Sequence, residues 1–284
     1  MTYRHTLSGL LLLSVLFTAD SPAQCSDAGV CSLGGVEEQD HVLIFSAAAS
    51  YGSSKDDDLS FTDVLMGLQA FPTEALFVSA ALPYRSMTGP LGSTSGIGDL
   101  LLTARYTVWS NDDLSASLEG GIRFATGAVN ERSLPQAYQP GLGTTDALLG
   151  VSLMGDRWSA SAGYQYAPGR SANSVNTLRR GDDISFRGTY LIYENDLRVR
   201  GEAIMIHKLQ ESNGTYLNTM IPGGSDIPDT DRTQINLVGD ISYPIQQNIM
   251  LNIRAAMALL SRPVNVDGLK RNFTVQAGLS IPLL

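Results

Sequence analysis

The sequence predicts an all-β fold: a closed antiparallel transmembrane β-barrel of about 12 strands, with short periplasmic turns and long extracellular loops. Three observations lead to this prediction. Segments of about 10 residues alternate between apolar and polar positions, as strands do when one face meets lipid. The connections between these segments are alternately short and long. The polar faces carry charges. A soluble β-sandwich would either bury these charges or expose its aliphatic face to water.

Composition narrows the class of protein further. The chain has 284 residues, of which 43% are hydrophobic and 17% are charged, below the roughly 25% of an ordinary soluble domain. The net charge of −9 argues against nucleic-acid binding, which needs a basic surface. Two cysteines cannot build a four-ligand zinc site. We therefore expect no metal, no cofactor and no nucleic-acid partner.

Residues 1–23 have the features of a secretory signal peptide. Arg4 and His5 precede an apolar stretch from Leu7 to Ala19, which is shorter than the about 20 residues of a membrane-spanning helix. The small residues of Ser21-Pro22-Ala23 then provide a cleavage site before Gln24. The sequence thus predicts export through the inner membrane.

The segment 24–39 precedes the first alternating segment, and we expect it to lie in the periplasm or to plug the barrel. It contains Cys25 and Cys31, which an oxidising compartment would favour as a small disulfide loop over free thiols. Gln24 directly before Cys25 disfavours a lipid-attachment site. The remaining residues, 40–284, form the predicted barrel domain.

Twelve alternating segments follow in the barrel domain. In 114–124, for example, apolar residues such as Leu118 and Ile122 share one face, and Glu119 and Arg123 share the other. The segments run over 41–52, 60–70, 75–85, 98–109, 114–124, 143–154, 158–166, 183–193, 197–205, 232–243, 248–260 and 273–281. Because strands in hydrocarbon must pair at every edge, twelve of them must close into a barrel.

The connections set the orientation of the predicted barrel. Those after the even-numbered segments are short (FPTE, SNDD, GDR, END and PIQQ), whereas 127–142, 168–182 and 209–231 are long and polar. An even strand number puts both termini at the short-turn rim. With a signal peptide, this rim faces the periplasm of a Gram-negative cell. The expected location is the bacterial outer membrane, and the expected partners are its lipids, the barrel-assembly machinery and a small-molecule solute.

Aromatic residues on the apolar faces gather near the predicted segment ends, as in the two girdles of membrane barrels. Near the short-turn rim fall Tyr106, Trp158, Tyr190 and Tyr243; near the long-loop rim fall Tyr51, Tyr84, Phe124 and Tyr166.

The polar faces supply the candidate functional residues, which we expect to line the lumen. They are Asp63, Asp99, Arg105, Glu119, Arg123, Asp146, Arg187, Arg198, Arg200, Glu202, Asp240 and Arg254. A two-residue turn near 194–195 would set Arg187 opposite Glu202, and a similar argument sets Arg105 beside Glu119. Each charge either sets solute selectivity or forms an internal ion pair that fills the barrel.

Three stretches resemble a known family of outer-membrane proteins. SGIGDLLLTARYTV (Ser95 to Val108) resembles the SGxGDL-type strand start of proteins described as meta-pathway phenol-degradation-like, or as transporters. GIRFATGA (Gly121 to Ala128) and PGLGTTDALLGVSL are similar to stretches that follow in that family. The resemblance implies passage of small, often aromatic, molecules across the outer membrane. The chain departs from common barrel proteins by ending Pro282-Leu283-Leu284, without a terminal aromatic.

The residues themselves favour a passive porin-like channel for small solutes or apolar molecules, and the resemblance implies small aromatic molecules among them. Alternatives are a barrel enzyme of lipase or protease type and a structural or adhesive surface barrel. An enzyme is disfavoured because only His41 and His207 survive signal cleavage, and neither has an evident serine partner. The acids of Lys55-Asp56-Asp57-Asp58 and of Asp226, Asp229 and Asp231 fit solvated loops rather than a protease site.

Overall fold

The computed structural model describes residues 32–33, 42–54, 58–169, 178–214, 225–246, 249–265 and 271–283. The predicted signal peptide, Cys25, Cys31 and His41 lie outside these ranges, as do Lys55, Asp56 and Asp57. Within the described ranges, no helix is both long and apolar enough to cross a membrane.

The described chain is almost entirely β-structure. The long strands are β1 (Leu43–Ser54), β2 (Ser60–Thr73), β3 (Leu76–Gly89), β5 (Leu100–Ser110), β6 (Leu114–Phe124), β7 (Asp146–Gly155), β8 (Trp158–Tyr166), β9 (Asp183–Glu194), β10 (Arg198–Lys208), β13 (Thr233–Gln246), β14 (Ile249–Leu260) and β15 (Arg271–Pro282). Short elements are β4 (Gly92–Ile97), β11 (Ser212–Gly214), β12 (Ser225–Ile227) and the 3-10 turns η2 (Glu131–Ser133) and η3 (Gln136–Tyr138).

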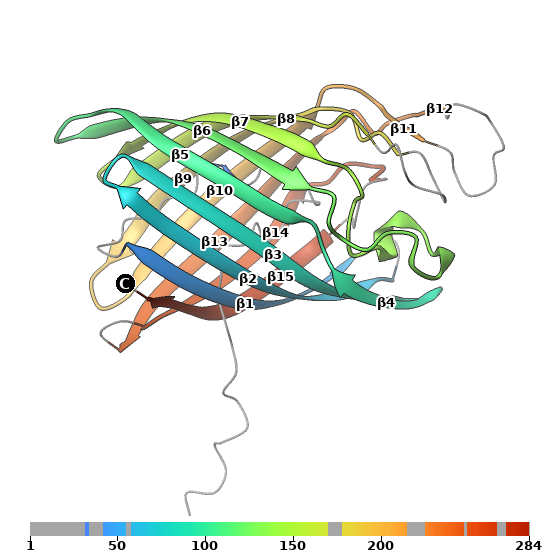
Figure 1. Ribbon diagram of the computed structural model, residues 1–284, viewed down its shortest axis with the longest axis horizontal. Helices are drawn as coiled ribbons and strands as arrows, with labels where there is room; N and C mark the ends of the chain where they lie inside the picture. The colour runs from blue at the N-terminus through green and yellow to red at the C-terminus, as the bar shows by residue number, and fades with distance from the viewer. Residues whose placement is uncertain are drawn as a thin grey trace, which may run out of the picture.

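The twelve long strands form a closed antiparallel barrel, which confirms the predicted fold (Figure 1). Each strand pairs with its neighbours along the chain, and β1 pairs with both β2 and β15 to close the ring. The seam joins eleven residue pairs, from Ile44 opposite Pro282 to Ser54 opposite Arg271, with one shift of register between Ser53 and Ser54. No edge of this sheet is left to lipid along the seam, as membrane barrels require.

The fourth predicted strand differs from the observed one. The chain breaks at Gly98 and Asp99, so that β4 ends before them and β5 begins after them. β4 pairs with the C-terminal part of β3 (Tyr84 to Gly89). β5 pairs with the N-terminal part of β3 (Leu76 to Ala81) and with β6. The break allows one continuous stretch of chain to serve as a hairpin arm and then as a wall strand.

Short turns collect at one rim and long connections at the other (Figure 1). The turn between β2 and β3 has two residues, and that between β7 and β8 also has two. The β11–β12 hairpin, within the long connection that the sequence left without structure, lies at the opposite rim with η2 and η3. The end of β15 lies at the short-turn rim beside the start of β1, because Leu283 donates its N–H to the carbonyl of Leu43.

The outer face of the barrel is apolar. Large exposed side chains alternate along the strands, for example Val64, Met66 and Leu68 on β2 and Leu149, Val151 and Leu153 on β7. The predicted girdle residues Tyr106, Trp158, Tyr190 and Tyr243, and Tyr51, Tyr84 and Tyr166, are all exposed. Phe124 is only half-buried. Such an outer face is stable in hydrocarbon and unfavourable in water, so the barrel is a membrane-spanning one.

Candidate functional site

The interior of the barrel holds the charged residues that the sequence singles out. On β2, β5 and β13, for example, buried or half-buried positions alternate with exposed ones, so that the side chains of one parity face inward. All twelve predicted lumen residues fall on the less exposed parity. Asp63, Asp99, Glu119, Arg123, Asp146, Arg187 and Asp240 are buried, and Arg105, Arg198, Arg200, Glu202 and Arg254 are half-buried.

A chain of ion pairs crosses β9, β10, β13 and β14. Arg187 Nε lies 3.6 Å from Glu202 Oε1, and Arg254 Nη2 lies 3.8 Å from Glu202 Oε2. Asp240 Oδ1 lies 3.1 Å from Arg200 Nη2, and Asp240 Oδ2 lies 3.9 Å from Arg254 Nε. Each carboxylate therefore lies between two guanidinium groups, an arrangement that offsets the cost of removing it from water.

The register of these pairs differs in part from the predicted one. The β9–β10 turn has three residues, Asn195 to Leu197, and a bulge follows at Val199 and Arg200. Arg187 is therefore opposite Ile204, two positions from the expected partner, and it reaches Glu202 diagonally. On β5 and β6, Arg105 lies directly opposite Glu119, as the turn length predicts.

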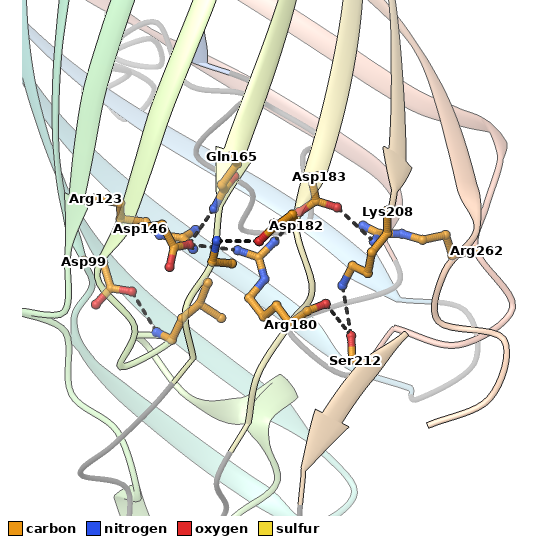
Figure 2. A network of polar contacts seen from close by, with 12 residues as sticks. Asp99, Arg123, Asp146, Gln165, Arg180, Asp182, Asp183, Lys208, Ser212 and Arg262 are labelled. Carbon is orange, nitrogen blue, oxygen red and sulfur yellow. Dashed lines mark hydrogen bonds and ion pairs between the residues drawn. The ribbon is translucent and has the colours of Figure 1, made fainter. Parts of the chain in front are cut away.

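A second, more deeply buried network lies at the long-loop end of the interior (Figure 2). Asp146 on β7 pairs with Arg123 on β6 and accepts a 2.5 Å hydrogen bond from Gln165 Nε2 on β8. Arg180, in the connection before β9, contacts Asp146 Oδ2 at 3.3 Å and Asp183 Oδ2 at 3.0 Å. Arg180, Asp146 and Asp183 are completely buried. We call this set, with Arg262, the upper network.

The upper network fastens three long connections to the wall. Arg262, which follows β14, lies 3.8 Å from Asp183. Lys208 at the end of β10 donates to Ser212 Oγ at 3.2 Å, and Ser212 donates to the carbonyl of Arg180 at 2.6 Å. Asp182 accepts bonds from the Tyr164 hydroxyl and the Ala167 N–H. Ion pairs and hydrogen bonds thus hold these connections against the wall at the long-loop end of the barrel.

Sequence reasoning did not select Arg85, Arg180, Asp182, Asp183, Lys208, Arg262 and Arg271. Arg180, Asp182 and Arg262 lie in connections, where no period marks an inward position. Arg85 and Lys208 lie on strands. The alternation that identified their neighbours as inward-facing could also have identified these two residues. Arg85 lies 3.7 Å from Asp63, and the Arg271 guanidinium lies 4.3 Å from the centre of the Phe61 ring.

The three stretches that carry the family resemblance meet at one point of the structure. Asp99 accepts hydrogen bonds from the N–H of Gly127 at 2.9 Å and of Leu142 at 2.8 Å. A Cβ on Gly127 would lie 2.7 Å from the Cα of Gly141, so only glycine allows this approach. Gly98 is similarly crowded by Pro83. These residues hold the β6–β7 loop (125–145) against the break between β4 and β5.

An apolar cluster lies between the charged parts of the interior. Its wall residues are Leu148, Ile204, Ile206, Val238 and Ala256, with Leu101 packed against them. Leu33 from the N-terminal segment completes the cluster, and only 3% of its surface is exposed. It fits beside Gly150, where an added Cβ would lie 3.0 Å from Leu33 Cδ1. We call this set the apolar cluster.

The interior has more cations than carboxylates. Counting inward strand residues and the buried loop residues of the described ranges, there are ten arginines and one lysine. The cations are Arg85, Arg105, Arg123, Arg180, Arg187, Arg198, Arg200, Arg254, Arg262, Arg271 and Lys208; the nine acids are Asp63, Asp99, Glu119, Asp146, Asp182, Asp183, Glu194, Glu202 and Asp240. Among the described interior residues, cations therefore outnumber carboxylates by eleven to nine, although the whole chain carries −9.

The described residues hold little that resembles a hydrolytic site. His207 Nδ1 lies 3.0 Å from Thr233 Oγ1, on the outward parity of β10. The Lys208–Ser212 pair is buried, and the Ser212 hydroxyl is engaged with a backbone carbonyl. No group of three side chains suited to hold a metal ion is found in the described part of the chain.

The closed ring, the apolar exterior and the charged interior define a transmembrane β-barrel of the outer-membrane type. A COG4313 outer membrane channel from Pseudomonas putida F1 has the same fold, with 15% identity, a TM-score of 0.64, and coverage of 87% of this chain and 99% of that one. The NanC porin is similar at 11% identity and a TM-score of 0.50, with 84% and 100% covered. No family model matches the sequence, and no curated protein matches it. Membership of the phenol-degradation-like family stays a prediction.

Proposed function

We propose that this protein is a bacterial outer-membrane channel through which small solutes, including apolar or aromatic ones, pass passively. The observation that carries this proposal is the interior of the closed barrel, where charged groups such as Arg200 and Arg254 remain partly exposed. Charged side chains that remain exposed inside a barrel require water there. The two solved barrels of similar fold are themselves described as a channel and a porin, which supports the proposal.

The proposed location is the outer membrane, with its lipids as partners. The apolar exterior supports lipid contact, and the two sets of exposed aromatic residues support two membrane interfaces. The predicted signal peptide supports export, with the short-turn rim toward the periplasm. The sequence contains no energy-coupling motif or nucleotide-binding loop, which favours passive passage.

The apolar cluster supports the choice of solute. A water-filled pore for polar solutes gains nothing from inward leucine, isoleucine and valine side chains, whereas an apolar solute gains free energy by contacting them. In the structure, Leu33 occupies this position and contacts the wall residues of the apolar cluster. We propose that the N-terminal segment around Leu33 acts as a plug, and that a passing solute takes its place against the wall.

Conductance of the purified chain in planar bilayers tests both parts of this proposal. We expect the unmodified chain to conduct weakly and Leu33→Asp to conduct more, because a carboxylate is unstable against the apolar cluster and would release the segment. Leu91→Asp is the matched control, since Leu91 is 62% exposed on the β3–β4 turn. Absence of conductance in all three chains would contradict a channel. Equal conductance in all three would contradict a plug.

A further inference from the structure

An unpaired hydroxyl group lies next to the apolar cluster. Thr274 faces inward on β15, and only 1% of its surface is exposed. Its Oγ1 is buried and has no hydrogen-bond partner in the described part of the chain. In the pairing of β14 with β15, Thr274 is directly opposite Ala256, which belongs to the apolar cluster. Residues paired in this way have Cα atoms about 4.5–5.5 Å apart, so the hydroxyl group lies at the border of the cluster.

Apolar side chains lie on both sides of this hydroxyl group. Thr274 is also opposite Gly52 on β1, and Gly52 is opposite Phe61 on β2. A Cβ added to Gly52 would lie 2.3 Å from Phe61 Cζ, so the aromatic ring reaches over the glycine. Phe61 is buried together with Met87 in a second apolar cluster. Thr274 therefore offers an uncharged hydrogen-bonding group between two apolar surfaces.

An unpaired hydroxyl group at such a place costs free energy. It has lost its hydrogen bonds to water without gaining others, whereas a valine of the same shape would have none to lose. A ligand that brings a donor or an acceptor to Oγ1 restores the missing hydrogen bond, and a threonine hydroxyl can serve in either role. The unpaired hydroxyl group thus indicates where the polar group of a bound molecule lies.

The charged groups around Thr274 are engaged with one another. On the β14 side, the Arg254 guanidinium lies between two carboxylates. On the β2 side, Asp63 lies 3.7 Å from Arg85 Nε and 3.9 Å from Arg271 Nη2. A charged ligand would have to break one of these ion pairs or stay without a counter-ion. A neutral ligand disturbs none of them.

We propose that Thr274 and the apolar cluster form a binding site for a small uncharged molecule that carries one hydrogen-bonding group, such as a hydroxyl, on an apolar body. The body packs on the apolar cluster in the place that Leu33 occupies, and the polar group bonds Thr274 Oγ1. This inference rests on the proposed function, because the solute has to displace Leu33. It adds the chemical class of the solute and the residue that recognises it. Binding is measured without conductance, so the site and the channel can fail separately.

Titration of the full-length protein with cyclohexanol in detergent micelles is the first test. With isotope labels on the isoleucine methyl groups, the NMR signals of Ile204 and Ile206 report on the apolar cluster, and Ile241 on the outer face reports on nonspecific effects. The signals of Ile204 and Ile206 should shift and saturate, whereas that of Ile241 should not. Cyclohexylammonium and cyclohexanecarboxylate should bind at least about tenfold more weakly. If cyclohexanol does not bind, or if a charged analogue binds as tightly, the proposal is wrong.

The variant Thr274→Val separates the hydroxyl group from the shape of the side chain. It should weaken cyclohexanol binding by about three- to tenfold, through loss of one neutral hydrogen bond, and leave methylcyclohexane binding unchanged. Thr274→Ser keeps the hydroxyl group and should bind cyclohexanol more tightly than Thr274→Val. Because all chains are titrated in the same detergent, partition of the probe into micelles cancels from the comparison. Equal cyclohexanol affinity in Thr274→Val and the unmodified chain would overturn the proposal.

The matched control is Ser46→Ala. Ser46 on β1 also has a buried hydroxyl group without a partner among the described residues, but it lies six positions before Gly52, toward the short-turn rim. Its removal should leave cyclohexanol binding unchanged. A loss of affinity in Ser46→Ala equal to that in Thr274→Val would assign the effect to the barrel as a whole and contradict a site at Thr274.

A measurement on the unmodified chain keeps the test decisive if Thr274→Val does not fold. The C1 proton of bound cyclohexanol should show a nuclear Overhauser effect to the methyl group of Thr274, and the other ring protons should show one to the methyl groups of Leu148 and Ile204. If the C1 proton contacts only Leu148 and Ile204, the polar group of the ligand does not reach Thr274, and the proposal is overturned.

Discussion

Replacement of Arg180 by methionine tests whether the upper network holds the barrel together. Arg180 is completely buried and lies 3.3 Å from Asp146 and 3.0 Å from Asp183. Removing one partner of a buried ion pair leaves the other charge without compensation, which costs about 3–5 kcal/mol. Asp146 would keep Arg123 and Gln165, so we expect a loss near the lower limit, about 3 kcal/mol.

The neighbouring residue provides the control. Arg179 is exposed, so Arg179→Met removes the same charge and side chain from the same connection and should change stability by less than about 0.5 kcal/mol. The free energy of unfolding would be measured in liposomes by urea titration. The two tryptophans, Trp109 and Trp158, are exposed on the lipid side and report departure from the membrane by fluorescence. If Arg180→Met and Arg179→Met unfolded at the same urea concentration, the upper network would not stabilise the barrel.

Four other predictions follow from the same structure. Val151→Arg places a charge on the lipid face of β7, which should cost about 2–4 kcal/mol and reduce the heat-modifiable folded band in cold SDS. Glu202→Ala should keep that band, because Arg254 is partly exposed and keeps Asp240 as a partner, but should shift the reversal potential toward anions. Asp99→Asn removes a charged acceptor of two backbone N–H groups, at about 1.5–3 kcal/mol, and should speed trypsin cleavage of the β6–β7 loop. A cysteine at Asp229 should react with an impermeant maleimide on intact cells and one at Asp112 should not; the reverse would overturn the orientation.

Most of the wall was predictable because period-2 alternation is strong wherever one face meets lipid. The strand 114–124 was predicted with the bounds that β6 has in the structure. The break at Gly98 and Asp99 was not predictable from alternation, because it depends on contacts with Pro83, Gly127 and Leu142 that lie far along the chain. Local sequence does not encode such contacts.

The candidate site was predictable to a smaller extent. Parity selected Arg187, Glu202 and Asp240, which the structure joins through Arg254. In the upper network it selected Arg123 and Asp146 but not the central residue, Arg180, which belongs to a long connection. The exact register also required the observed turn and bulge near Val199, which turn length in the sequence did not determine.

The β1–β15 seam has a consequence for how the chain is assembled. Ile44 and Pro282 are 238 positions apart, so the last contact to form joins the two ends of the barrel sequence. Contacts of such separation are slow to form, because the loop entropy is lost before the pairing free energy is gained. Until β15 is in place, β1 and β14 each present an unpaired edge that invites aggregation. Insertion and closure should therefore be late and concerted, and a chain shortened by its final strand should be degraded rather than accumulate as a smaller barrel.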